Sequence, residues 1–172
     1  AFPGERGKER IITAYLNQIP YGHNAYGIAA AARVYFGEPM ADLSLSQVAM
    51  LAGLPQSPSV LDPYRYARTT TRKDKTRIVV PTCQYTLDVT GQAKAKRGCT
   101  EVAPVARRNY ILRAVLDANT RWTRITPEQY LEALNEPIVL VGDKVLRYKA
   151  PHFVWAMKTR LATAGANLVH AT

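Results

Sequence analysis

Apolar residues recur at helical spacing near the start of the chain and predict two helices joined by a turn. The first helix is expected over residues 8–19, because apolar side chains would share one face there: Ile11, Ile12, Tyr15, Leu16 and Ile19. Pro20 ends this helix, and a turn follows at residues 21–24. The second helix is expected over residues 27–36, where a run of alanines would let another backbone approach closely. Gly37 supplies a left-handed stop.

A third helix is expected to begin at Ser44, because Ser44 and Gln47 have the spacing of a capping box. It ends near Gly53. The two prolines of residues 54–59 then predict a rigid loop without helical structure. Large aromatic side chains at helical spacing are expected in the core, namely Tyr15, Tyr26, Tyr35 and Phe36.

Residues 64–104 have a different character, because they are rich in threonine, lysine and arginine. Residues 77–80 and 84–89 have the composition of β-strands. We interpret the whole segment as an inserted, partly β structure on the surface.

The helical pattern returns after this segment. Helices are expected over residues 105–116 and after Thr126, which has capping-box spacing. Residues 138–148 predict a small hairpin that turns at Gly142. Pro151 would open a last amphipathic helix. The predicted fold class is therefore mainly α, with β accessories.

Composition and charge narrow the functional classes. The chain has 172 residues with 47% hydrophobic and 21% charged residues, which is typical of a folded globular protein. It contains no run of 18 or more apolar residues that would span a membrane. Most of the net charge of +10 comes from residues 64–108, which hold eleven basic and three acidic residues. Such a segment suits nucleic acid, anionic lipid headgroups or phosphorylated substrates.

The cysteines and histidines suggest few further sites. Cys83 and Cys99 both lie in the basic segment, where they would form a disulfide in an oxidising compartment or remain two free thiols. No histidine or cysteine stands at zinc-ligand spacing nearby. His23 and His152 are interpreted as lone histidines without partners, in a turn and at a helix start.

Several sequence blocks, in this order, resemble the peptidoglycan glycosyltransferases of family 51, which form the polymerase module of class A penicillin-binding proteins. The fourth block of the family is matched by residues 11–22 (IITAYLNQIPYG), 25–28 (AYGI), 30–37 (AAARVYFG) and 43–59 (LSLSQVAMLAGLPQSPS), closing with Asp62-Pro63. Residues 107–112 (RRNYIL) resemble the fifth block, and residues 150–154 (APHFV) resemble the stretch before a transpeptidase domain.

The chain departs from the family pattern in three respects. The first three blocks, which carry the acidic catalytic pair and a second functional glutamate, are missing and would lie upstream of Ala1. Thr13 stands where the family usually has a glutamate that is not catalytic. The insertion between the fourth and fifth blocks is longer than most members carry.

The resemblance implies a lysozyme-like, mostly helical domain of which this chain is the later portion. Its expected parts are a helical wall of the substrate cleft at residues 1–63, the basic insertion at 64–104, helices and hairpin at 105–150, and the start of a linker at 151–172. The chain would act at the extracytoplasmic face of the bacterial cell membrane, with its anchor outside this fragment.

The resemblance also implies the reaction. The parent enzyme would polymerise lipid II, a lipid-linked disaccharide-pentapeptide, into glycan strands with inversion and release of undecaprenyl diphosphate. A carboxylate must act as general base, and cations must stabilise the diphosphate. No catalytic residue is expected in this fragment, which would be inactive alone. No cofactor is expected in it either, although Mg²⁺ or Mn²⁺ would serve the parent.

Substrate contacts are expected from four residues, by their match to family positions or by their polar place beside the turn: Ser59, Gln56, Asn17 and Asn24. Each has a structural alternative, because such side chains also cap loops and satisfy turn amides. Glu5 and Glu9 lie among basic residues and are interpreted as a solvated helix start rather than as the base.

The expected partners are lipid II, the growing glycan strand, an anionic membrane surface and other cell-wall synthesis proteins. One alternative is a module that binds glycan or lipid II without turnover. Another is nucleic-acid binding through the basic segment. That alternative is disfavoured because few aromatics are interleaved with the charges, only Tyr64, Tyr66 and Tyr85.

Overall fold

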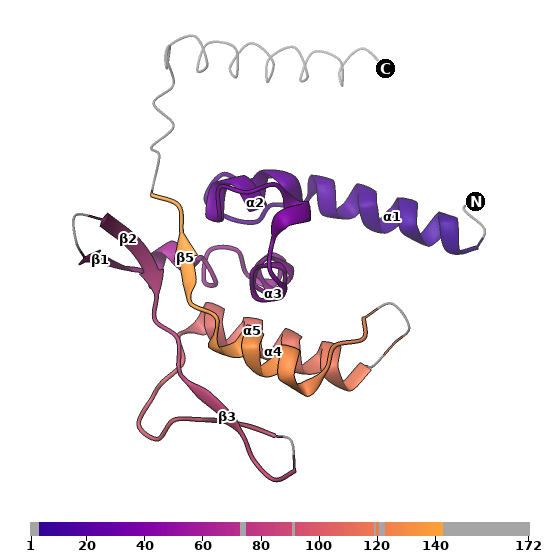
Figure 1. Ribbon diagram of the computed structural model, residues 1–172. Coiled ribbons are helices and arrows are strands. Elements are labelled where there is room, and N and C mark those ends of the chain that lie inside the picture. Colours follow the sequence, from indigo (N-terminus) through magenta and orange to yellow (C-terminus); the bar gives the residue numbers. More distant parts are fainter. Residues whose placement is uncertain (1–3, 73–74, 91, 119, 121–122, 143–172) are drawn as a thin grey trace, which may run out of the picture. The chain divides into compact units, whose positions relative to one another are not determined.

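The computed structural model describes residues 4–72, 75–90, 92–118, 120 and 123–142. The α-helices in this part are α1 (Glu5–Gln18), α2 (Ile28–Tyr35), α3 (Leu45–Gly53), α4 (Ala103–Ala118) and α5 (Pro127–Asn135) (Figure 1). The strands are β1 (Arg68–Arg72), β2 (Lys75–Val80), β3 (Tyr85–Leu87), β4 (Ala93–Ala95) and β5 (Ile138–Leu140). The architecture is mainly helical, as predicted. The last predicted helix, with His152 and the stretch at 150–154, lies outside the described residues.

Local side-chain chemistry sets two of the helix starts. The Ser44 hydroxyl accepts a hydrogen bond from the Gln47 amide, and the Gln47 side chain accepts one from the Ser44 amide, which begins α3. Thr126 and Gln129 make the same pair of bonds at the start of α5. Gly37, with φ of 76°, follows α2 as the predicted left-handed stop.

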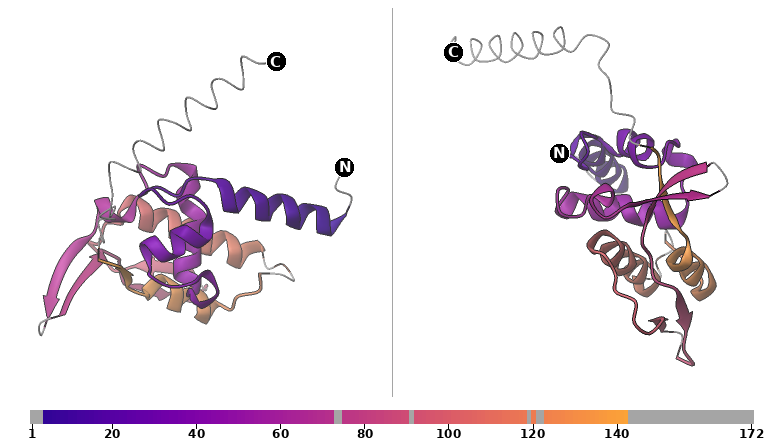
Figure 2. Two further views of the ribbon diagram at one scale, coloured as in Figure 1. Left: turned by 90° about the horizontal axis from the view of Figure 1, so that it is seen from above. Right: turned by 90° about the vertical axis from the view of Figure 1, so that its left-hand side faces the viewer.

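The strands form two small antiparallel sheets. β2 is the central strand of the first sheet, between β1 and β5, and β3 pairs with β4 in the second. Figure 2 shows the hairpin of β1 and β2 extending away from the helices. β5 lies where the first strand of the 138–148 hairpin was predicted, but it pairs with β2, and the predicted return strand lies outside the described residues.

The core consists of two clusters of buried side chains. The first lies between α2, α3 and the first sheet and includes Tyr21, Tyr35, Met50, Leu51, Leu54, Val80 and Val105. The second gathers around α4 and α5 and includes Cys83, Tyr85, Leu112, Tyr130 and Leu134.

The interpretation of residues 64–104 as a surface segment is therefore wrong for its middle part. Val80, Cys83 and Tyr85 are all buried in the core. Cys83 forms a disulfide with Cys99, and their Cα atoms lie 5.8 Å apart. The outer half of the segment is exposed, including most of β1 and the start of β2.

Two further predictions need correction. Tyr35 and Phe36 are buried as expected, but Tyr15 and Tyr26 are 57% and 70% exposed. Periodicity identifies an apolar helix face without showing what covers it. Residues 54–59 also begin with a 3₁₀ turn, Leu54–Gln56, rather than a non-helical loop. Proline is tolerated there because the first turn of a helix leaves its amides unbonded.

Arg108 of α4 is fully buried and binds the elements around it. Its guanidinium donates to the Ser46 hydroxyl of α3 at 3.0 Å and to the carbonyls of Leu134 and Glu136 at 2.8 and 3.4 Å. The Nε atom donates to the Asn109 side chain at 2.9 Å. Burial lowers the pKa of Arg108, but the neighbouring Tyr85 hydroxyl and then the Glu136 and Glu101 carboxylates oppose this effect. This single side chain therefore links α3, α4 and the end of α5.

In the part of the chain that the structure describes, no helix combines the length and the apolar character needed to cross a lipid bilayer.

Candidate functional site

A closed turn follows α1 and carries the first candidate residues. The Tyr21 amide donates to the Ala25 carbonyl at 2.9 Å, and the Ala25 amide donates to the Gly22 carbonyl at 2.8 Å. Gly22, His23 and Asn24 all have positive φ, of 83°, 48° and 58°. Asparagine and histidine adopt this conformation more readily than most residues, and glycine adopts it freely. The sequence of this turn thus matches its backbone.

The turn lies directly against the Pro-Ser loop, which comprises residues 56–62. A Cβ atom on Gly22 would lie 2.9 Å from the Pro58 carbonyl oxygen and 3.0 Å from the Tyr35 hydroxyl. Only a residue without a side chain allows this approach. The turn that holds Asn24 and the loop that holds Ser59 are therefore neighbours in space.

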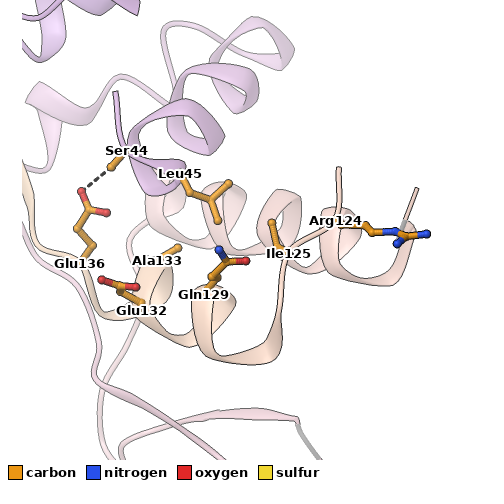
Figure 3. A pocket seen from close by; sticks show the side chains of 8 residues that line it. All are labelled: Ser44, Leu45, Arg124, Ile125, Gln129, Glu132, Ala133 and Glu136. Atoms are coloured by element: carbon orange, nitrogen blue, oxygen red, sulfur yellow. Dashed lines mark hydrogen bonds between the residues drawn. The ribbon is translucent and has the colours of Figure 1, made fainter. Parts of the chain in front are cut away.

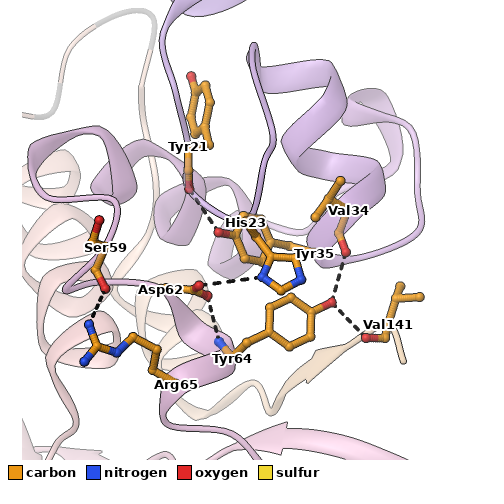
Figure 4. Close-up of polar contacts among 9 residues, drawn as sticks. All are labelled: Tyr21, His23, Val34, Tyr35, Ser59, Asp62, Tyr64, Arg65 and Val141. Carbon is orange, nitrogen blue, oxygen red and sulfur yellow. Dashed lines mark hydrogen bonds and ion pairs between the residues drawn. The ribbon is translucent and has the colours of Figure 1, made fainter. Parts of the chain in front are cut away.

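His23 joins these two segments, so the prediction that it is a lone histidine is wrong. Its Nδ1 atom lies 3.7 Å from a carboxylate oxygen of Asp62, and its ring stacks on Tyr64 with centroids 4.3 Å apart (Figure 4). Asp62 also accepts a hydrogen bond from the Tyr64 amide at 3.0 Å. Asp62 follows His23 by 39 positions, so no local sequence pattern could indicate that the two side chains pair.

Two tyrosines fix this cluster to the helical core. The Tyr35 hydroxyl donates to the Tyr21 carbonyl at 3.0 Å, and the Tyr64 hydroxyl bridges the carbonyls of Val34 and Val141 at 3.0 and 2.8 Å. Burial, followed by the nearby Asp62 carboxylate, raises the pKa of Tyr35. The Tyr35 phenol therefore stays neutral and keeps its hydrogen bond at any physiological pH.

The Pro-Ser loop presents its polar side chains to solvent. The amides of Val60 and Leu61 donate to the Ser57 carbonyl, and the guanidinium of Arg65 donates to the Ser59 carbonyl at 2.8 Å. These bonds hold the backbone. Within the described residues, the side chains of Gln56 and Ser59 are exposed and make no hydrogen bond. Both remain available to a ligand.

The predicted substrate-binding residues are thus brought together in part. Asn24 lies in the turn beside Pro58, next to the loop of Gln56 and Ser59. Asn17 is the second-last residue of α1, and its side chain is exposed. A Cβ atom on Gly27 would lie 2.6 Å from the Asn17 carbonyl oxygen, so the backbones approach closely there. Sequence reasoning did not assign roles to Gly22, Asp62 or Tyr64, although they hold this arrangement in place.

A cavity of about 380 Å³ lies elsewhere, between the start of α3 and α5 (Figure 3). Its lining is Ser44, Leu45, Arg124, Ile125, Gln129, Glu132, Ala133 and Glu136, and it includes none of the predicted substrate-binding residues. The Ser44 hydroxyl donates to Glu136 at 2.6 Å. Because Glu132 and Glu136 are acidic and Arg124 is the single basic residue, the lining does not suit a diphosphate.

The described residues contain no candidate metal site. Nowhere among them do three or more histidine, cysteine, aspartate or glutamate side chains lie close enough together to hold an ion. Glu9 is exposed on α1, as expected for a solvated helix start, and Glu5 is the first residue of that helix.

The comparisons with known proteins agree on one family. A family model described as Transglycosylase matches residues 4–82. Penicillin-binding protein 1A of Aquifex aeolicus is 32% identical over 141 residues, which are 82% of this chain and 14% of that protein. Penicillin-binding protein 1A of Haemophilus influenzae is 33% identical over 132 residues, which are 77% of this chain and 11% of that protein.

A solved structure agrees with the sequence matches. The crystal structure of penicillin-binding protein 1A from Haemophilus influenzae is similar with a TM-score of 0.53 and 31% identity, over 83% of this chain and 16% of that chain. This chain belongs to the transglycosylase family. The resemblance to class A penicillin-binding proteins, inferred from the ordered blocks, is confirmed.

The family assignment covers the candidate residues. Asn17, Asn24, Gln56 and Ser59 all lie inside the part that the transglycosylase family matches, which ends at residue 82. The chain spans about one-seventh or less of the length of these two relatives. The disulfide and the strands β3 and β4 lie beyond the range that the family model matches.

Proposed function

We propose that this chain forms the donor side of the cleft in a peptidoglycan glycosyltransferase whose complete form polymerises lipid II. The observation that supports the proposal is the close approach of Gly22 to Pro58, because the turn of Gly22 also holds Asn24 and the loop of Pro58 also holds Gln56 and Ser59. The polar side chains of Gln56 and Ser59 face solvent without a protein partner in the described region. Such groups suit the hydroxyls and phosphates of a lipid-linked sugar.

The reaction sets demands that this chain meets only in part. A sugar hydroxyl of the acceptor attacks the anomeric carbon of the donor, and the bond from that carbon to the diphosphate oxygen breaks. The electron pair leaves with undecaprenyl diphosphate, and a carboxylate base takes the hydroxyl proton. We assign the base to residues outside this chain, because Glu9 is exposed among Lys8 and Arg10 on α1. The chain alone would then bind substrate without forming polymer.

The proposed location is the outer face of the bacterial cell membrane. The Cys83–Cys99 disulfide supports it, since disulfides persist in oxidising compartments and are rare in the cytosol. Lipid-linked sugars are polymerised there, so compartment and substrate agree. A divalent cation would assist the departing diphosphate in the complete enzyme.

Binding of lipid II in detergent micelles to the full chain tests the proposal. The double variant Gln56→Ala with Ser59→Ala is expected to bind about tenfold to a hundredfold more weakly, because each lost hydrogen bond contributes about 0.5–1.5 kcal/mol. Titration by microscale thermophoresis measures the change.

A matched control separates this effect from a general loss of polar surface. Gln84→Ala with Thr86→Ala removes the same kinds of group from exposed positions in or beside β3. This variant is expected to bind like the original chain. Equal affinities of the two double variants would show that the Pro-Ser loop does not contact lipid II.

A further inference from the structure

The register of the β1–β2 hairpin places basic side chains on one face. Thr70 pairs with Arg77 and Arg68 pairs with Val79, while Lys75 lies two residues before Arg77 on the same strand. Directly paired residues of antiparallel strands share a face, and residues two apart on a strand do so as well. Arg68, Lys75 and Arg77 therefore lie on one face, and all three are exposed.

The opposite face of the hairpin carries no charge. Thr69, Thr71 and Thr76 alternate with the basic positions, and the Thr71 and Thr76 hydroxyls are hydrogen bonded at 3.4 Å. Farther along β2, Ile78 packs against the first core cluster and Val80 is buried within it. The hairpin is thus two-sided, with one neutral face that continues into the core and one basic face that is open to solvent.

The basic face is a concentrated positive surface. Neither β1 nor β2 contains an acidic residue. In the described part of the chain, no carboxylate forms an ion pair with Arg68, Lys75 or Arg77. At its base the same face carries Val79 and Val139, which pair across β2 and β5 and are half-buried. Positive charge therefore adjoins a small apolar contact area.

We infer that this face docks on anionic lipid headgroups at the membrane surface. A row of basic residues attracts anionic lipids, and the flanking valines suit the boundary between headgroups and acyl chains. A surface that binds single-stranded nucleic acid usually carries exposed aromatic side chains on which the bases stack. The tyrosines of this segment do not provide them, because Tyr85 is buried, Tyr64 stacks on His23 and Tyr66 packs against the first core cluster. The disulfide in the same segment also indicates a compartment outside the cytosol.

This surface goes beyond the proposed polymerase function. None of its residues belongs to the turn or loop assigned to substrate, so failure of one proposal leaves the other standing. A transglycosylase that takes a lipid-borne substrate would gain from a hairpin that holds it close to the bilayer.

Flotation of the full chain with vesicles of phosphatidylglycerol and phosphatidylcholine tests the inference. The chain is expected to float with anionic vesicles and not with pure phosphatidylcholine. Each basic residue near an anionic surface strengthens binding about fivefold. The triple variant Arg68→Gln, Lys75→Gln, Arg77→Gln is therefore expected to bind on the order of a hundredfold more weakly. A variant with Arg68→Lys and Arg77→Lys keeps the charge and should bind like the original chain.

The control variant removes the same charge from other elements, through Lys8→Gln, Arg33→Gln and Arg124→Gln, all at exposed positions. Its binding is expected to fall by less than about fivefold, since distant charges are screened. An equal loss in both triple variants would overturn the inference, because net charge alone would then explain binding. Tighter binding to a single-stranded oligonucleotide than to anionic vesicles, abolished by the hairpin variant, would also overturn it.

Discussion

Replacement of Arg108 with alanine is expected to lower the free energy of unfolding by about 3–5 kcal/mol, as is usual when a large buried side chain is removed and its hydrogen-bond acceptors lose their donor. The guanidinium is fully buried and donates to the Ser46 hydroxyl and to the carbonyls of Leu134 and Glu136. Without it, these acceptors lose their donor inside the protein, and a cavity forms between α3, α4 and α5. Urea denaturation followed by circular dichroism measures the loss.

Arg113→Ala is the matched control, because it removes the same side chain from the same helix. Arg113 makes one ion pair near the surface, with Asp117 at 2.9 Å. Exposed pairs at this spacing contribute about 0.3–0.5 kcal/mol, so the expected loss is small. If both variants unfolded at the same urea concentration, the buried arginine would not hold these helices together.

Replacement of Gly22 with alanine is expected to destabilise the chain by about 2–5 kcal/mol and to weaken lipid II binding with it. Gly22 has φ of 83°, which costs an alanine about 1–2 kcal/mol. Its new Cβ atom would also lie 2.9 Å from the Pro58 carbonyl oxygen, so the Pro-Ser loop must move. Overpacking of this kind costs about 1–3 kcal/mol more. Thermal unfolding and the lipid II titration together measure both effects.

Gly98→Ala isolates the part of this effect that comes from the backbone alone. Gly98 has φ of 84°, nearly that of Gly22, but no atom of the described residues lies within 4 Å of the place that its Cβ atom would take. The expected cost is therefore only the conformational one, about 1–2 kcal/mol. Lipid II binding should not change. Equal effects of the two substitutions would mean that contact with Pro58 plays no part in stability or binding.

Features set by neighbouring residues could be predicted from the sequence. The capping boxes at Ser44 and Thr126 are present because each needs only residues three positions apart. The left-handed stop at Gly37 follows from one residue type. It was harder to predict which apolar residues are buried. Tyr15 and Tyr35 both stand at helical spacing, yet Tyr15 is mostly exposed and Tyr35 is buried.

Features set by distant residues could not be predicted. The pairing of β5 with β2 joins residues about 60 positions apart, and no local pattern encodes it. From the sequence, Arg108 was counted among the basic residues of 64–108, and nothing there indicated that its acceptors would come from α3 and the end of α5. A buried arginine has the same sequence signal as an exposed one, since its burial depends on where those acceptors fold.

The candidate site was found mainly through the resemblance to a family. Residue type alone does not distinguish Ser59 from any other exposed serine. The ordered blocks singled out its loop, and the structure adds the contact between that loop and Gly22. Asp62 and Tyr64 support this contact through an ion pair with His23 and stacking on its ring. Both lie far from His23 in the sequence, so only the fold reveals these interactions.

The most direct test of the proposed substrate site is amide chemical-shift mapping of the isotopically labelled full chain with lipid II in micelles. The largest shifts are expected at residues 21–24 and 56–60, on the two adjoining turns. Contradiction would come from shifts concentrated around the cavity between α3 and α5, at Leu45 and Ala133, with none at Ser59.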